Sequence, residues 1–125
     1  MKHLLDVNLL LAAIWGNHPQ HTAAAAWFAG KSVVVCPLTE LGFLRISANP
    51  EATNAPMADA RTLLEMFLAS HQATRIADDL PALDSRPTTS AQVTDHYLAD
   101  LAAKNGFKLA TFASGIKHAA VELVS

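Results

Sequence analysis

The chain has 125 residues, of which 51% are hydrophobic and only 16% are charged, and its formal net charge at pH 7 is -2. A chain of this length typically folds around one hydrophobic core, so we expect residues 1–125 to form a single domain. No apolar run approaches the ~20 residues that cross a bilayer, and the first residues lack the pattern of a secretory signal. We therefore expect a soluble, cytoplasmic protein. The negative net charge argues against binding of nucleic acid by overall positive charge and leaves only a local cluster of Lys and Arg for that purpose.

The N-terminal stretch KHLLDVNLLL, residues 2–11, predicts a buried strand that stops at Asp6 and turns at once into a helix over residues 8–15. Asp6 has two interpretations. Its carboxylate caps the new helix by accepting hydrogen bonds from free N–H groups, or it points into the crevice at the strand ends, where open α/β sheets place their chemistry. Asp6 alone does not decide between them.

The rest of the chain alternates between helical and strand-like apolar patterns, and proline and glycine mark many of the boundaries. Further helices are predicted over residues 17–31, 37–49, 58–71 and 88–106, and strands over residues 32–36, 74–77, 108–112 and 120–124, with loops at 49–57 and 78–87. This order predicts an α/β fold with a mainly parallel sheet of four or five strands and helices on both faces.

The last predicted helix contains the second informative acid. Thr89 or Ser90 can cap its start, and Asp95 then shares an apolar stripe with Leu98 at helical spacing. A charged acid on a buried stripe needs a reason, because burial without a partner is costly. Asp100 is five residues further on, and we interpret it as ordinary surface.

Three other features support weaker hypotheses. His18 and His21 are three residues apart, but no third ligand accompanies them, so a metal site there is disfavoured. Asp78 and Asp79 are interpreted as part of a solvated loop. The only cysteine lies in the run VVVCP, which predicts a buried apolar residue rather than a reactive thiol.

Three acids stand where an open α/β sheet gathers its ligands. Asp6 follows the first strand, Glu40 lies in the first turn of the helix after the second, and Asp95 faces inward from the helix before the fourth. Three carboxylates brought together would force one of them to take up a proton unless a cation were present. Oxygen ligands favour Mg²⁺ or Mn²⁺, and such an ion suits phosphodiester hydrolysis because it activates water and offsets phosphoryl charge.

The chain resembles the PIN-domain ribonucleases, specifically the VapC-type toxins of bacterial toxin–antitoxin pairs. The resemblance covers nearly the whole chain and is found in the segments LLDVNLLLA, LTELGFLRISANP, QVTDHYLADLAAKNG and KLATF. It implies a PIN-like three-layer α/β/α sandwich and a metal-dependent endoribonuclease whose site acids match Asp6, Glu40 and Asp95. Asn8 matches the polar residue that supports the first acid, and Thr111 matches the hydroxyl residue at the end of the fourth strand.

One departure from the family pattern affects the expected activity. The family usually continues the fourth strand with another acid, whereas this chain has Ala113 in the run TFASG. Ser114 or a water could take the missing place beside a single ion. The alternative function is therefore a weakened or inactive relative that acts by binding RNA or an antitoxin.

The resemblance also implies the substrate and the partners. Water activated at the metal would cut tRNA or another structured RNA, leaving a 5′ phosphate and a 3′ hydroxyl, with Arg45 and Lys108 as candidate RNA contacts. A homodimer and a VapB-type antitoxin are the implied protein partners, and the apolar content of the chain agrees with such contacts.

Two competing classes fit the sequence less well. A phosphoacceptor receiver domain would pair two acids after its first strand and place a Lys after its last, which this chain does not do. A purely structural binding module would have no need of Asp95 on a buried stripe.

Overall fold

Five parallel strands form one sheet in the order β3-β2-β1-β4-β5. The computed structural model describes all 125 residues. Its strands are β1 (Lys2–Leu5), β2 (Ser32–Val35), β3 (Thr74–Arg75), β4 (Lys108–Thr111) and β5 (Val121–Leu123). Its α-helices are α1 (Val7–Ile14), α2 (His21–Trp27), α3 (Pro37–Ala48), α4 (Met57–Ser70) and α5 (Val93–Lys104), and two short 3₁₀ turns are η1 (Ala82–Asp84) and η2 (Ser90–Gln92). No helix is both long and apolar enough to cross a membrane.

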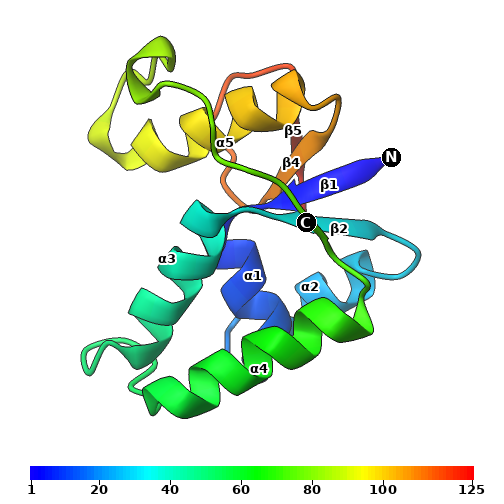
Figure 1. The fold of residues 1–125 in the computed structure, drawn as a ribbon, viewed down its shortest axis with the longest axis vertical. Coiled ribbons are helices and arrows are strands. Elements are labelled where there is room, and N and C mark those ends of the chain that lie inside the picture. The colour runs from blue at the N-terminus through cyan, green and yellow to red at the C-terminus, as the bar shows by residue number, and fades with distance from the viewer.

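The sheet is the middle layer of a three-layer sandwich, which confirms the predicted fold class. Figure 1 shows α5 on one side of the sheet and α1, α2, α3 and α4 on the other. Successive strand residues alternate between the two layers, since side chains of a strand point to opposite faces in turn. Leu4, Val34 and Leu109 belong to the core beneath α5, whereas Leu5 and Val33 belong to the larger core on the other face.

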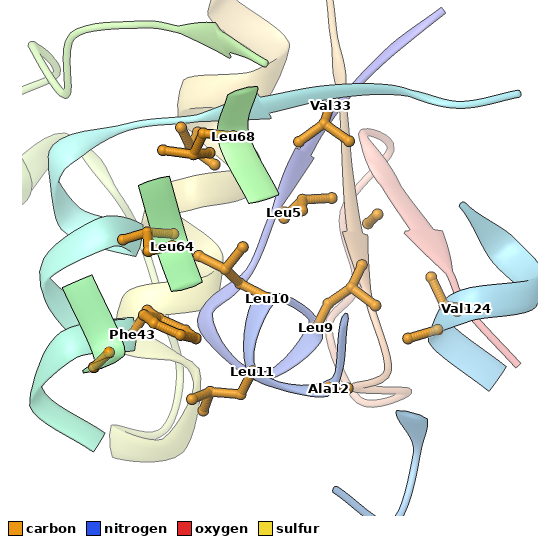
Figure 2. Close-up of a cluster of buried hydrophobic side chains, with 14 residues drawn as sticks. Leu5, Leu9, Leu10, Leu11, Ala12, Val33, Phe43, Leu64, Leu68 and Val124 are labelled. Carbon is orange, nitrogen blue, oxygen red and sulfur yellow. The ribbon is translucent and has the colours of Figure 1, made fainter. Parts of the chain in front are cut away.

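The larger core surrounds α1, which is apolar on nearly all sides. In Figure 2, Leu9 and Leu10 of α1 lie among side chains from the strands and from the helices α3 and α4. Both leucines are completely buried, as is Phe43 of α3. Burying one such side chain contributes roughly 1.5–3 kcal/mol, so α1 is held rigidly at the end of β1.

The strand order puts the ends of three central strands at one edge of the sheet. β1 pairs with β2 on one side and with β4 on the other, and Leu5 lies opposite Ala110. Because all strands run the same way, the residues that follow β1, β2 and β4 meet at the carboxyl edge. Asp6, Cys36 and Phe112 are those residues.

The start of α3 is fixed locally, as Pro37 predicted. The helix begins at that proline, and the Thr39 hydroxyl accepts a hydrogen bond from the backbone N of Cys36 at 3.1 Å and donates to its carbonyl oxygen at 2.9 Å. Cys36 is completely buried, in agreement with its interpretation as an apolar residue.

Several predicted boundaries are wrong. The helix expected over residues 88–106 begins only at Val93, because η2 precedes it, and neither Thr89 nor Ser90 makes a capping hydrogen bond with its side chain. The helix expected over 17–31 is confined to α2, and the strand expected over 74–77 has two residues. Asp95 therefore lies in the first turn of α5 rather than in its middle.

We predict that Gly42→Ala destabilises the fold through the contact between α1 and α3. A Cβ at position 42 would lie 2.6 Å from Val7 Cγ2. Alanine gains about 1 kcal/mol of helix propensity, but overpacking costs about 1–3 kcal/mol, so a net loss of about 1 kcal/mol is expected in urea unfolding. The double variant Val7→Ala, Gly42→Ala should recover most of the loss caused by overpacking, and equal effects of Gly42→Ala in both backgrounds would contradict the overlap.

Candidate active site

Asp6 lies at the carboxyl end of β1 and is only 2% exposed. Its Oδ1 accepts a hydrogen bond from the backbone N of Leu9 at 2.7 Å, which caps α1. Its Oδ2 accepts a hydrogen bond from the hydroxyl of Thr111, at the end of β4. The capping interpretation is thus confirmed, and the same side chain also lies at the edge where the central strands end. Each oxygen keeps a second acceptor site, because a carboxylate offers about four lone pairs.

Burial sets the charge state of Asp6. Loss of hydration raises its pKa from 3.8 to about 6, against the hydrogen bonds from Thr111 and Leu9, which lower it. The carboxylate of Asp95 raises the pKa of Asp6 further. Near neutral pH, Asp6 therefore carries a negative charge that its surroundings disfavour.

Asp95 approaches Asp6 from the other layer of the sandwich. It is half-buried in the first turn of α5, and burial raises the pKa of its carboxyl. No cationic side chain contributes to the pKa shift of Asp6 or of Asp95. Asp95 thus raises the pKa of Asp6 with no cation to offset it, and an external cation would stabilise both ionised acids.

Glu40 lies at the same edge of the sheet but is engaged elsewhere. Its Oε2 is 3.3 Å from a guanidinium nitrogen of Arg75, which ends β3. It also lines a groove with Arg61 and Glu65 of α4. No group of three or more His, Cys, Asp or Glu side chains is arranged to hold a metal ion. The structure thus brings Asp6 and Asp95 together and leaves Glu40 paired with Arg75.

The end of β4 contacts the Asp6 carboxylate through Thr111. The Thr111 hydroxyl donates to Asp6 and accepts a hydrogen bond from the backbone N of Ala113 at 3.0 Å. Ala113 is half-buried and places a methyl group where the family usually has an acid, whereas Ser114 is exposed and makes no hydrogen bond. Thr111 therefore orients the Asp6 carboxylate, and position 113 supplies no acid.

The remaining predicted residues lie away from the two acids. Asn8 is exposed, and its side chain is within hydrogen-bonding distance of Gln20 and His18 rather than Asp6. Arg45 is in the last turn of α3. Lys108 opens β4 at the amino edge of the sheet, and its ammonium donates to the carbonyl oxygen of Ala119 at 3.1 Å.

Asp100 is a residue that the sequence interpretation missed. It is half-buried rather than ordinary surface, with Oδ1 2.8 Å from His118 Nε2 and Oδ2 3.5 Å from His96 Nδ1. The spacing of His96 and Asp100, four residues apart on a helix, was a local indication of this contact. His118 comes from the segment between β4 and β5, and no local pattern pointed to it.

The weaker candidates also have partners. His21 Nδ1 lies 2.7 Å from the carbonyl oxygen of Ala12, so it helps to attach α2 to α1. Asp79 pairs with Lys104 at 2.9 Å, and both Asp78 and Asp79 are exposed, as a solvated loop requires.

The two acids suit a hard divalent ion. Mg²⁺ is usually bound through one or two carboxylates together with several waters, and Asp6 and Asp95 offer that donor set. An ion would remove the repulsion that raises the pKa of Asp6 and would replace part of the lost hydration. The residues present therefore fit a metal held by two carboxylates, with Glu40 outside the set in this arrangement.

Comparison with known proteins places these features in a family. A family model described as PIN domain matches residues 3–122. Ribonuclease VapC38 of Mycobacterium tuberculosis (strain ATCC 25618 / H37Rv) is 37% identical over 121 residues, which cover 90% of this chain and 86% of the relative. Ribonuclease VapC39 of the same strain is 36% identical over 133 residues, which cover 96% of this chain and 94% of the relative. Ribonuclease VapC44 of that strain is 32% identical over 132 residues, which cover 97% of this chain and 92% of the relative. The resemblance inferred from the sequence is confirmed.

We predict that Asp6→Asn stabilises the metal-free protein near neutral pH. The pKa of Asp6 is about 6 in the fold against 3.8 in the reference state, so the folded state binds the proton more tightly. The free energy of unfolding should then fall as pH rises from 3.8 to about 6. At about pH 7 the ionised Asp6 should lower the free energy of unfolding by about 2–3 kcal/mol.

Thermal unfolding in chelator measures this effect, with Asp59→Asn on the exposed surface of α4 as the control. The advantage of Asp6→Asn should shrink as pH falls and should disappear below about pH 3, where the carboxyl is largely protonated in both the folded and the unfolded state. A difference that is independent of pH would show that ionisation of Asp6 is not its source.

Proposed function

The chain belongs to the PIN-domain family, and from this premise we propose that it is a VapC-type endoribonuclease toxin that hydrolyses RNA phosphodiester bonds with Mg²⁺ or Mn²⁺. The observation that supports the proposal best is the buried acid Asp6 and the half-buried acid Asp95 at the carboxyl edge of the sheet, with no cation contributing to the pKa shift of either. Ribonuclease is the activity in the names of VapC38, VapC39 and VapC44.

Asp6 and Asp95 would hold the metal ion through their free oxygen lone pairs. A bound divalent ion lowers the pKa of water and offsets charge on a phosphoryl group. Asp6 must be ionised for this role, so metal affinity should rise with pH through the region around the pKa of about 6 that Asp6 has without metal. Thr111 and the N-terminus of α1 fix the Asp6 carboxylate by hydrogen bonds, which keeps the donor atoms in place before RNA arrives.

The reaction is a hydrolysis with a defined balance of atoms. The oxygen of water forms a bond to phosphorus, the bond between phosphorus and the 3′ oxygen breaks, and the 3′ oxygen receives a proton. The products are a 5′ phosphate and a 3′ hydroxyl. In-line attack needs the water and the leaving oxygen on opposite sides of phosphorus, so the positions of the two acids determine which phosphodiester can react.

Glu40 remains the proposed third acid. It starts α3 at the correct edge of the sheet, and its ion pair with Arg75 is a weak restraint, because Arg75 is 63% exposed and exposed pairs contribute about 0–1 kcal/mol. A change of Glu40 rotamer is therefore inexpensive compared with the repulsion between carboxylates that a bound ion would relieve.

We propose a VapB-type antitoxin and a second copy of the chain as protein partners. Large apolar side chains are exposed on neighbouring helices: Leu41 of α3 is 64% exposed and Met66 of α4 is 61% exposed. Such side chains are typical of protein contacts when they lie on adjoining elements. The alternative, a weakened nuclease that acts by binding, is supported by Ala113 in place of the fourth acid.

Metal-dependent cleavage is the direct test of the proposed function. The chain, freed of any partner, should cut RNA in a panel of total cellular RNA and tRNA with Mg²⁺ or Mn²⁺, and chelation should abolish cleavage. Asp95→Asn and Asp6→Ala should each reduce the rate by at least about 100-fold, since changes beside metal ligands alone cost ~10–100-fold. Asp59→Asn is the control, and circular dichroism checks folding. A panel left intact with metal present would contradict the nuclease proposal.

The missing acid allows an opposite test by gain of function. Ala113→Asp should increase metal affinity, measured by calorimetry, or the cleavage rate at low metal concentration, because Ala113 is the residue whose backbone N contacts Thr111. Ser114→Asp is the matched control for added charge on the exposed neighbour. If Ala113→Asp changes neither quantity, the fourth acid has no role in this chain.

A further inference from the structure

A polar cavity lies between the segment before α5 and the segment after β4, and its lining includes none of the acids Asp6, Glu40 and Asp95. It encloses about 350 Å³ and is lined by six residues, none of them hydrophobic: Arg86, Thr88, Gln92, His96, Gly115 and Lys117. No acidic side chain lines it. Every side chain in its wall can donate a hydrogen bond, which is the chemistry of a site for an anion.

The two cations in this cavity have no partner within the chain. Arg75 pairs with Glu40 and Lys104 pairs with Asp79, whereas neither Arg86 nor Lys117 makes a salt bridge or a side-chain hydrogen bond. Arg86 reaches the cavity from the segment before α5 and Lys117 from the segment after β4, and like charges that line one cavity repel each other. An anion between them would remove the repulsion.

The walls of the cavity are tied together before any ligand binds. Gln92 Nε2 donates to the carbonyl oxygen of Gly115 at 3.0 Å, and Gln92 Oε1 accepts from the Thr88 hydroxyl at 3.4 Å. One side chain therefore links the segment before α5 to the segment after β4. Ser85 Oγ lies 3.1 Å from His96 Nδ1 and fixes the next turn of the wall. Such links reduce the ordering cost of binding.

The position of the cavity suits a contact with substrate. Gln92 precedes Asp95 by three residues, which is one helical turn, and Gly115 follows Ala113 by two. The cavity is thus bounded by the same two segments that bring Asp95 and Ala113 to Asp6. We propose that this cavity binds a backbone phosphate of the RNA next to the one that is cut, with Arg86 and Lys117 as its cationic ligands. The proposal rests on the proposed function, because it names a subsite for the same substrate.

The test separates binding from cleavage. A fluorescein-labelled single-stranded RNA of random sequence is titrated with the full chain in chelator, where no cutting occurs, over a range of salt concentrations. Arg86→Ala and Lys117→Ala should each weaken binding by at least about threefold and reduce the salt slope by about 0.7, the value for one phosphate contact on a single strand. Both residues are exposed, so folding should be unaffected.

Matched controls distinguish a local site from general charge. Lys2→Ala removes an exposed cation at the amino edge of the sheet and should leave the RNA affinity at the value of the parent chain, unlike the two cavity variants. Arg86→Lys and Lys117→Arg keep the charge and should keep the salt slope. Inorganic phosphate is the second probe: it should shift the amide resonance of Gly115 in the parent chain but not in the variant that carries both Arg86→Ala and Lys117→Ala.

The outcomes separate this inference from the nuclease proposal. If Arg86→Ala and Lys117→Ala bind RNA as tightly as Lys2→Ala while the parent chain cleaves RNA, the subsite is wrong and the nuclease proposal stands. If the parent chain cleaves nothing but the cavity variants lose RNA affinity, the subsite stands alone. Phosphate shifts without any loss of RNA affinity would assign the cavity to small anions and overturn the RNA subsite.

Discussion

The burial of one carboxylate, that of Asp6, is the constraint on which the site depends. Its side chain is 2% exposed, yet both oxygens accept hydrogen bonds, from Leu9 at the start of α1 and from Thr111 at the end of β4. These bonds exist only because β1 lies between β2 and β4 and because α1 begins at once after the strand. The sheet order and the short turn thus hold the Asp6 carboxylate where it is poorly hydrated. A nearby cation stabilises the ionised form of such a carboxylate strongly, because water does not.

Much of the fold was predictable because it is specified locally. Strand residues such as Leu4 and Leu5 are apolar in succession, which indicates burial on both faces, and Pro37 marks the start of a helix with a fixed φ. The start of α5 was not predictable in this way. Threonine is a residue type that often caps helices, and the backbone of Thr89 is extended, but its side chain makes no capping hydrogen bond. The 3₁₀ turn η2 lies between Thr89 and the start of α5 at Val93. Local preference there yields to the contacts of the neighbouring loop.

The site was predictable only as far as topology determines it. Parallel strands bring the residues after β1 and β4 to one edge, which places Asp6 beside Thr111 whatever their rotamers. The partner of Glu40 is Arg75, 35 residues away, and the pairing of Asp100 with His118 likewise joins distant segments. The spacing of residues in the sequence does not predict such pairs, because they depend on the path of the loops over the sheet.

Ala113 links the chemistry of the site to its stability. An acid at this position would add a third negative charge next to Thr111 and Asp6, and repulsion would raise the pKa of Asp6 beyond about 6 in the absence of metal. The methyl group avoids that cost, so the metal-free fold is under less electrostatic strain than a site with every family acid. The same change removes a potential ligand. In the proposed metal site, each remaining carboxylate would therefore matter more for holding an ion, while less of the binding energy of that ion would be needed to overcome repulsion between acids.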